Sequence, residues 1–284
     1  MAVAADAPSD DPSDPVDDPV EEVSALQVET VSVEQVSADA WQTVRFDGPI
    51  EDAVVIMGPV SANGGQAALT RVRNVTEDGF EFQIEEWDHL DGYHKEVEVT
   101  WMAASAGDYE LEDGRKVSFG ATSAADERPT DVSLDGFDAP PIIVSQVGSY
   151  NGNQAVATRT SDVTEDGFSV RMQEMEASDG EHRPETVYWM AVEEGEGALS
   201  AMLIGGGVDH QWVDSEIVMP DHVLADMQSF NGPNTASLRF DETDDNTLAL
   251  RVQDERSLDN EIWHVTEQVG AVFTNDEALL LTHI

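Results

Sequence analysis

The segment from Glu85 to His94 concentrates side chains that could bind a sugar. It combines the indole of Trp87, the carboxylates of Asp88 and Asp91 and the imidazole of His94 beside a predicted turn. Carboxylates and imidazoles exchange hydrogen bonds with hydroxyl groups, and an aromatic face stacks on the C–H face of a pyranose. The residue types therefore predict a carbohydrate-binding site on this segment.

A second copy of the pattern adds further predicted ligand-binding residues. Glu174, Asp179, His182 and Glu185 form the corresponding group in the second copy. Asn63 and Asn151 each precede a glycine upstream of these groups. A purely structural interpretation stays open beside the functional one. The aspartates can cap turns, the histidines can pair with a carboxylate, and the Asn-Gly pairs can form loop turns.

An arginine and an acidic residue also recur in each copy. If they lie on neighbouring strands of one sheet, their simplest role is a cross-strand ion pair, and we expect this arrangement in all three copies. The residues are Arg71, Arg159 and Arg239, with Glu86, Glu174 and Asp254 as their expected partners.

The sequence supports metal binding and catalysis less than it supports sugar binding. Calcium stays open because residues 88–92 and 244–247 could supply oxygen ligands, but no D-x-D-x-D-G loop with a closing glutamate occurs. No two histidines have the i,i+2 or i,i+4 spacing of a transition-metal site. Motifs such as G-x-S-x-G, a phosphate-binding loop and H-E-x-x-H are absent from the sequence. We therefore expect a non-catalytic protein that needs no cofactor.

The segments that carry these residues belong to an internal repeat. The hexapeptide VTEDGF occurs at residues 75–80 and again at an offset of 88, and the two copies share 21 of 50 aligned residues around it. A more diverged third copy follows at a further offset of 80. There Ile262 occupies the histidine position, with Trp263 and His264 adjacent, so the three copies need not bind alike.

Each copy is predicted to form short β-strands, because apolar and polar residues alternate between turn residues. Phe80, Phe82 and Ile84 share one face of such a strand, and the preceding glycine supplies the positive φ of a tight hairpin. About six antiparallel strands per copy predict an all-β fold of three tandem six-stranded sandwich modules. The expected modules are 41–129, 130–208 and 209–284, with closing strands at 116–120, 201–205 and 278–282.

Residues 1–40 differ in composition from the modules. They contain eleven acidic residues, no basic ones and four prolines, so they bury too little apolar surface to offset their ordering entropy. We expect a mostly disordered segment, fully so in 1–24, with a strand or an adhesive arm at 25–38. The start lacks the features of a Sec signal peptide, and no apolar run is long enough for membrane insertion.

The net charge is the most extreme property of the composition. With 59 acidic and 13 basic residues the formal charge is −46, which excludes nucleic acid as a natural partner and disfavours anionic membranes. Self-repulsion on this scale is relieved by salt, so the charge predicts a halophilic source. The absence of cysteine excludes disulfides and thiolate metal sites.

The repeated pattern also resembles a known family. An apolar strand is followed by N-G, by R-x-x-x-V-T-x-x-G-F, by an acidic strand, and by D-G-x-H and V-x-W-x-A. This resembles the H-type lectin domain of the snail agglutinin and discoidin C-terminal type, in three copies over residues 41–284. The resemblance implies a six-stranded sandwich, assembly as a trimer, and recognition of GalNAc-type sugars in clefts between protomers. The family's sugar-contacting Trp-His pair falls at residues 87–88, 175–176 and 255–256, where the sequence differs.

These features together predict a lectin-like, carbohydrate-binding protein with glycans or glycoproteins as partners. It would act in cell adhesion, outside the cell, on a cell surface or on a virion, with sugars bound at module edges or interfaces. The three copies are expected to pack around a pseudo-threefold axis within one chain, and a homo-oligomer is the other option. Two alternatives stay open: a structural or assembly protein whose modules are packing units, and an accessory module of a secreted enzyme.

Overall fold

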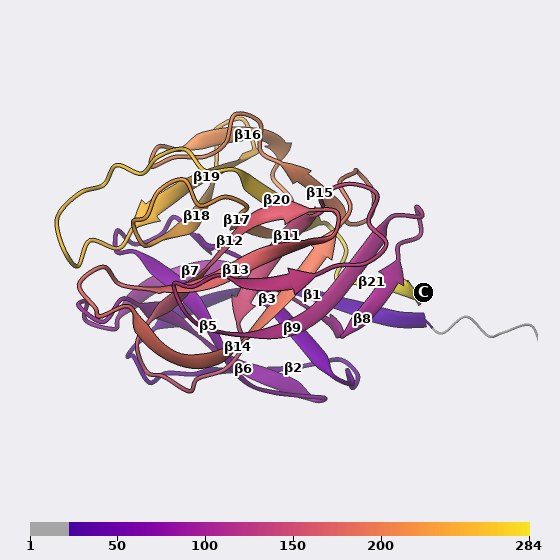
Figure 1. Ribbon diagram of the computed structural model, residues 1–284, viewed down its shortest axis with the longest axis horizontal. Coiled ribbons are helices and arrows are strands. Elements are labelled where there is room, and N and C mark those ends of the chain that lie inside the picture. The colour runs from indigo at the N-terminus through magenta and orange to yellow at the C-terminus, as the bar shows by residue number, and fades with distance from the viewer. Residues whose placement is uncertain (1–22) are drawn as a thin grey trace, which may run out of the picture.

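The computed structural model describes residues 23–284, and every regular element in that range is a β-strand (Figure 1). The predicted all-β fold with antiparallel sheets is confirmed. Residues 1–22, for which we predicted disorder, lie outside the described range. No helix able to cross a lipid bilayer occurs between residues 23 and 284.

One plan of strand pairing occurs three times along the chain. In each case six strands pair as two three-stranded antiparallel groups. One group of the first repeat and one of the second belong to a continuous eight-stranded sheet. The sixth strand lies between the first and the third, and the fifth lies between the second and the fourth. The first set is β1 (Val23–Gln35), β2 (Gln42–Arg45), β3 (Ala53–Met57), β5 (Ala68–Thr76), β6 (Gly79–Glu86) and β7 (His94–Ser105).

The other two sets follow the same plan, and their pairings correspond one to one. The second set is β9 (Lys116–Asp126), β10 (Thr130–Ser133), β11 (Ile142–Val147), β12 (Val156–Thr164), β13 (Gly167–Glu174) and β14 (Glu181–Val192). The third set is β15 (Ser200–Leu203), β16 (Val213–Val218), β17 (His222–Met227), β18 (Ala236–Glu242), β19 (Thr247–Asp254) and β20 (Val269–Thr274). We call these sets the first, second and third repeat.

Strand pairing groups the chain differently from the sequence boundaries. β1 is hydrogen-bonded to β7 along most of its length, so residues 23–35 belong to the first repeat and are not a free arm. β9 pairs with β14, and β15 pairs with β20. The strands expected to close the first two modules are therefore the first strands of the next repeat. The predicted module boundaries differ from the observed repeats by one strand.

Each repeat has its own apolar core between its two sheets. Phe80, Phe168 and Leu248 occupy the same position of β6, β13 and β19, and each is buried in the core of its own repeat. The alternation of Phe80, Phe82 and Ile84 is thus explained by one buried face. The opposite face of β6 is also covered from Gln83 onward, because a neighbouring repeat packs there.

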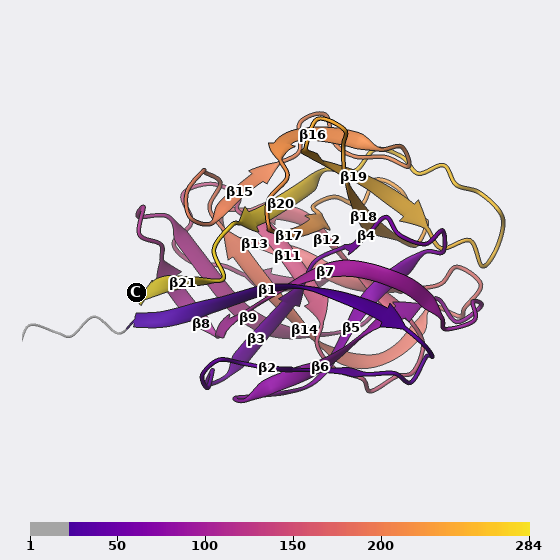
Figure 2. The ribbon, with the colours of Figure 1, turned by 180° about the vertical axis from the view of Figure 1, so that it is seen from behind.

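A fourth apolar core joins the three repeats. It contains one residue from the same position of the third strand in each repeat, namely Ile56, Val144 and Leu224, all of them almost fully buried. β11 contacts both β3 and β17, and β17 also contacts β7. The repeats therefore form a closed ring around a shared core, not a line of separate beads (Figures 1 and 2).

Three additional strands connect the ring. β8 (Gly107–Glu110) and β21 (Ala278–His283) pair with each other, and β21 also pairs with β1, so the last strand of the chain lies beside the first (Figure 2). β4 (Val60–Ser61) forms a short parallel pair with β18 of the third repeat. The first repeat is thereby hydrogen-bonded to the third through backbone groups.

Candidate functional site at the junctions between repeats

Each repeat contributes one arginine to the boundary with the next. Arg71 on β5, Arg159 on β12 and Arg239 on β18 are fully buried. Each guanidinium donates to backbone carbonyls of an Asn-Gly loop in the following repeat, and Arg239 does so with the first repeat. These loops are residues 149–154, 229–234 and 61–66. The arginines mark three corresponding boundaries, named the 1–2, 2–3 and 3–1 junctions.

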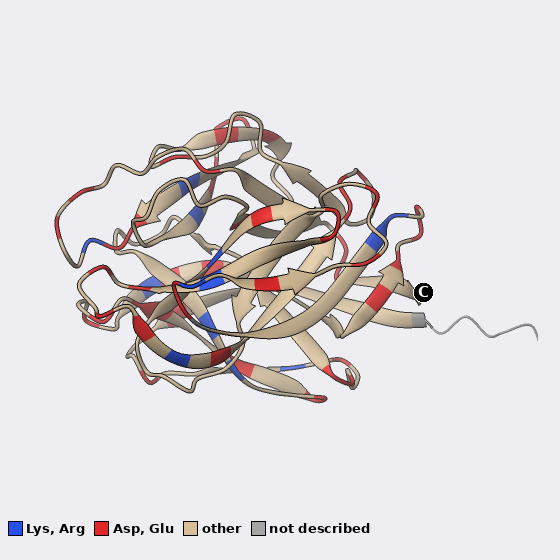
Figure 3. Ribbon diagram, in the orientation of Figure 1, with Lys and Arg blue, Asp and Glu red and all other residues tan. Residues whose placement is uncertain are grey.

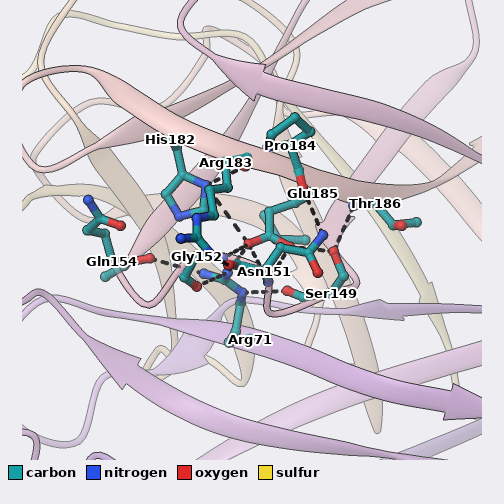
Figure 4. A network of polar contacts seen from close by, with 12 residues as sticks. Arg71, Ser149, Asn151, Gly152, Gln154, His182, Arg183, Pro184, Glu185 and Thr186 are labelled. Atoms are coloured by element: carbon teal, nitrogen blue, oxygen red, sulfur yellow. Dashed lines mark hydrogen bonds and ion pairs between the residues drawn. The ribbon is translucent and has the colours of Figure 1, made fainter.

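At the 1–2 junction Arg71 lies between two carboxylates, as Figure 4 shows in part. Its Nη2 donates to Glu185 Oε1 at 2.9 Å and its Nη1 donates to Glu85 Oε2 at 3.2 Å. Glu185 also accepts from the backbone N–H groups of Asn151 and Gly152, both at 2.8 Å. One buried carboxylate therefore binds the arginine of one repeat and the loop of the other.

The 2–3 junction repeats this arrangement. Arg159 Nη2 donates to Glu267 Oε1 at 2.8 Å, and Glu267 accepts from the N–H groups of Asn231 and Gly232 at 3.0 and 2.9 Å. Gln173 replaces the second carboxylate and accepts from Arg159 Nη1 at 3.1 Å. The same loop is thus held by the same kind of ion pair.

The 3–1 junction is built without a carboxylate. The position that corresponds to Glu185 is Val97, and Arg239 forms no ion pair with any residue of the described chain. Burial, reinforced by the charge of Arg251, lowers the pKa of Arg239 to about 10. The guanidinium donates only to neutral acceptors, which are the carbonyls of Val60, Ser61, Asn63 and Gln66 and the side-chain oxygen of Gln253.

A buried histidine lies directly behind the glycine of each Asn-Gly loop. A Cβ added to that glycine would lie 2.5–3.2 Å from the imidazole ring, so the close packing explains why glycine follows asparagine here. The pairs are Gly64 with His94, Gly152 with His182, and Gly232 with His264. His264, and not Ile262, therefore occupies the histidine position of the third repeat.

Two of these histidines bind the carboxylate that ends the fifth strand of their repeat. His94 Nδ1 lies 2.9 Å from Glu86 Oε1, and His264 Nδ1 lies 2.6 Å from Asp254 Oδ1. His182 Nδ1 instead contacts a backbone carbonyl. The predicted ion pairs between the arginines and these acidic residues were wrong. Each arginine binds the preceding side chain of the fifth strand and reaches across to the next repeat; the side chains that it binds are Glu85, Gln173 and Gln253.

The protonation of the two histidine pairs differs. Burial, followed by the charge of Arg239, lowers the pKa of His94 to about 4, and burial raises the pKa of Glu86 to about 7. Burial also disfavours charge on His264, but hydrogen bonds to two carboxylates outweigh it and raise its pKa. Burial would likewise raise the pKa of Glu267, yet its hydrogen bonds hold it at about 2. The shifts of His94 and Glu86 thus favour their uncharged forms, whereas the shift of His264 favours its charged form.

The predicted sugar-binding residues of the first repeat do not meet in one open cleft. Trp87 is buried and packs against Ala155 and Ala157 of the second repeat, and His94 is buried behind its loop. Asp88 is exposed and accepts from the Ala155 N–H at 3.1 Å. The indole expected to stack on a sugar therefore belongs to a contact between repeats.

Most of the remaining predicted site residues also form hydrogen bonds within the protein. Asp91 and Asp179 each accept from a backbone N–H two residues later, so they cap turns. Glu174 is buried beside the capped turn and His182. The Asn63 carbonyl accepts from an arginine, and Asn151 Nδ2 donates to a backbone carbonyl. Of these six residues, Asn151 lines an open groove.

The loops that follow the fifth strands gather at one end of the ring. His89 Nδ1 lies 3.6 Å from Glu255 Oε2, and the Glu176 N–H donates to Glu255 Oε1 at 2.8 Å. The three loops carry many of the exposed acidic residues at the left of Figure 3. Residues 23–284 nevertheless contain no group of three or more side chains placed to hold a metal ion.

The two largest surface grooves beside the Asn-Gly loops lie at the second and third repeats. The larger, about 570 Å³, is formed by both repeats at the 2–3 junction. The smaller, about 450 Å³, lies over the loop of the second repeat near the 1–2 junction. Polar groups of the first groove include Asp162, Arg171, Asn231 and Gln268, beside the ring of Phe230. Both grooves combine an aromatic residue with amides and charged groups.

The sequence reasoning placed Glu185 in the predicted ligand-binding group, missed Glu267, and assigned neither carboxylate to a junction. Glu185 and Glu267 each lie three residues after a histidine, at His182 and His264, and this shared His-x-x-Glu spacing was present in the sequence. It was hidden because the third repeat has two additional residues before its histidine. Aligning the histidines would have revealed both glutamates and the exception at Val97.

Comparison with known proteins shows similarity to a part of one large protein. Halomucin from Haloquadratum walsbyi (strain DSM 16790 / HBSQ001) is 28% identical over 269 residues, which is 88% of this chain and 3% of halomucin. No family model matches the sequence. No solved structure matches it. The chain is therefore similar to a short part of a very long halophile protein.

Proposed function

We propose that this chain is a non-catalytic carbohydrate-binding module of an extracellular protein, with ligands bound beside the junctions between repeats. The observation that supports it most is the groove of about 570 Å³ at the 2–3 junction, formed by two repeats and holding an aromatic ring, amides and charged groups. Sugar sites combine these same chemical groups in a shallow concave surface. The similarity to halomucin, whose name denotes a mucin, supports an extracellular setting.

A glycan array probed with the full chain in molar NaCl tests this proposal. We expect binding to a defined set of glycans, followed by titration calorimetry on the best of them. Gln268→Ala removes an exposed amide of the 2–3 groove and should weaken binding, whereas Gln211→Ala, an exposed glutamine outside the groove, should not. Folded protein that binds no glycan at any salt concentration would refute the proposal.

A structural role is the second candidate, and the junctions favour it. The residues that sequence patterns assigned to ligand binding are largely used for contacts between and within repeats. In that case the ring would be a packing unit of a larger assembly. The same array separates the two, because a packing unit would show no glycan selectivity.

A further inference from the structure

The groove at the 2–3 junction contains an arginine without an acidic partner. Arg171 on β13 forms no ion pair among residues 23–284, its Nη2 reaches Ser161 Oγ only at 3.4 Å, and its buried Nε has no hydrogen-bond partner. A buried donor without a partner costs free energy, so a ligand that satisfies it gains affinity.

The position of this arginine is fixed by an aromatic ring. The Arg171 guanidinium lies 4.2 Å from the ring centroid of Phe230, and Arg159 lies 4.9 Å from the same ring. Stacking uses the face of a guanidinium and leaves its N–H edge for partners in the plane. Since Arg159 is neutralised by Glu267, Arg171 supplies the groove's unpaired positive charge.

The corresponding positions in the other repeats do not offer this site. Gln83 replaces the arginine in the first repeat, where Trp41 stacks against Arg73. In the third repeat Arg251 stacks on Trp212. The second repeat alone combines the arginine with a groove shared between two repeats. The arginine itself recurs as Arg251, whose buried Nε also has no hydrogen-bond partner. The shared groove, and not the arginine alone, therefore distinguishes the second repeat.

We propose that the 2–3 groove binds a saccharide bearing a carboxylate or sulfate group, anchored by Arg171. A guanidinium binds such groups with two parallel hydrogen bonds, which keep their strength at short range when salt screens distant charges. Asn231 and Gln268 lie in the same groove as donors and acceptors for hydroxyl groups, and Asp162 is its one carboxylate. This inference rests on the proposed function and names the class of sugar.

Calorimetry in molar NaCl tests the inference with three probes: a uronic acid oligosaccharide, a sulfated hexosamine and a neutral oligosaccharide of equal length. We expect one or both anionic probes to bind at least about tenfold more tightly than the neutral one. Arg171→Gln should remove this preference and Arg171→Lys should restore it only partly. Arg45→Gln, which removes an exposed arginine outside the groove, should change nothing.

The outcomes separate the two proposals. Equal affinity of wild-type protein for neutral and anionic probes would overturn the inference and leave the proposed function intact, as would unchanged binding by Arg171→Gln. No binding of any glycan would overturn both. If Arg171→Gln fails to fold, the competition between anionic and neutral probes on wild-type protein still decides.

Discussion

The 2–3 and 3–1 junctions perform the same task with different chemistry. At the 2–3 junction Arg159 is neutralised by Glu267, which also binds the loop amides. At the 3–1 junction Arg239 binds four backbone carbonyls and a glutamine, and β4 adds a parallel pair to β18. A buried guanidinium can therefore be satisfied by a carboxylate or by neutral acceptors. Only in the first case would removal of the arginine leave a buried charge without its partner.

The sharpest test of this comparison replaces each arginine by methionine. Arg159→Met leaves Glu267 buried without its cation, so we expect a loss of about 3–5 kcal/mol in the free energy of unfolding. Arg239→Met leaves only neutral carbonyls unsatisfied, so we expect about 1–3 kcal/mol. Urea unfolding of both variants in the same salt measures the difference. Equal losses would show that the ion pair has no special weight.

The 1–2 junction has an apolar element that can be tested separately. Trp87→Ala would open a cavity against Ala155 and Ala157, and we expect a loss of about 3–5 kcal/mol in stability. Affinity for glycans, measured at a temperature where the variant is folded, should be unchanged. Loss of binding in folded protein would instead support the role of Trp87 that the sequence suggested.

The two carboxylates Glu86 and Glu267 should contribute to the pH dependence of stability with opposite signs. The pKa of Glu86 is raised to about 7, so its native form holds a proton that the unfolded chain releases near pH 4.5, and its contribution is lost as pH rises toward 7. Glu267, with a pKa of about 2, contributes stability above pH 4.5 that is lost as pH falls toward 2.

Melting temperatures of Glu86→Gln against wild-type protein between pH 4 and pH 8 check this sign. The melting temperature of the variant should rise relative to that of the wild type between about pH 4.5 and pH 7, and the difference should then stay constant. A difference that does not change with pH would mean that Glu86 titrates normally.

The turn caps should give the smallest effects. Asp91, Asp179 and Asp259 each accept from a backbone N–H in the loop at the end of the ring. Because these carboxylates are exposed, Asp179→Ala should cost only about 0.5–1 kcal/mol in thermal unfolding and leave sugar binding unchanged. A binding defect without a stability change would place Asp179 in the ligand site.

The sequence was sufficient for the fold because its information is local. The alternation around Phe80 and the recurrence of VTEDGF at an offset of 88 predicted the strands and the repeated units. It was misleading for the strand that opens each repeat. In the sequence, such a strand lies between two repeats and could belong to either. Only its hydrogen bonds show that it belongs to the repeat that follows.

The junctions were beyond local reasoning. The partner of Arg71 across the junction is Glu185, 114 residues away, and the predicted partner Glu86 is bound by His94. Trp87 resembled an exposed aromatic because it follows an acidic strand, yet the second repeat covers it. In a ring of repeats, packing between neighbouring repeats decides which polar residues are exposed. The sequence of a single repeat does not contain this information.

The pairing of the first and last strands has a mechanical consequence. Val23 lies opposite Thr282 in the antiparallel β1–β21 pair, so the two strand ends emerge side by side. Tension applied between these ends would peel β21 from β1 one hydrogen bond at a time, as a zipper opens, and would not shear all of the bonds together. The ring would then yield to stretching first at its seam, while the three sandwich cores keep their shape.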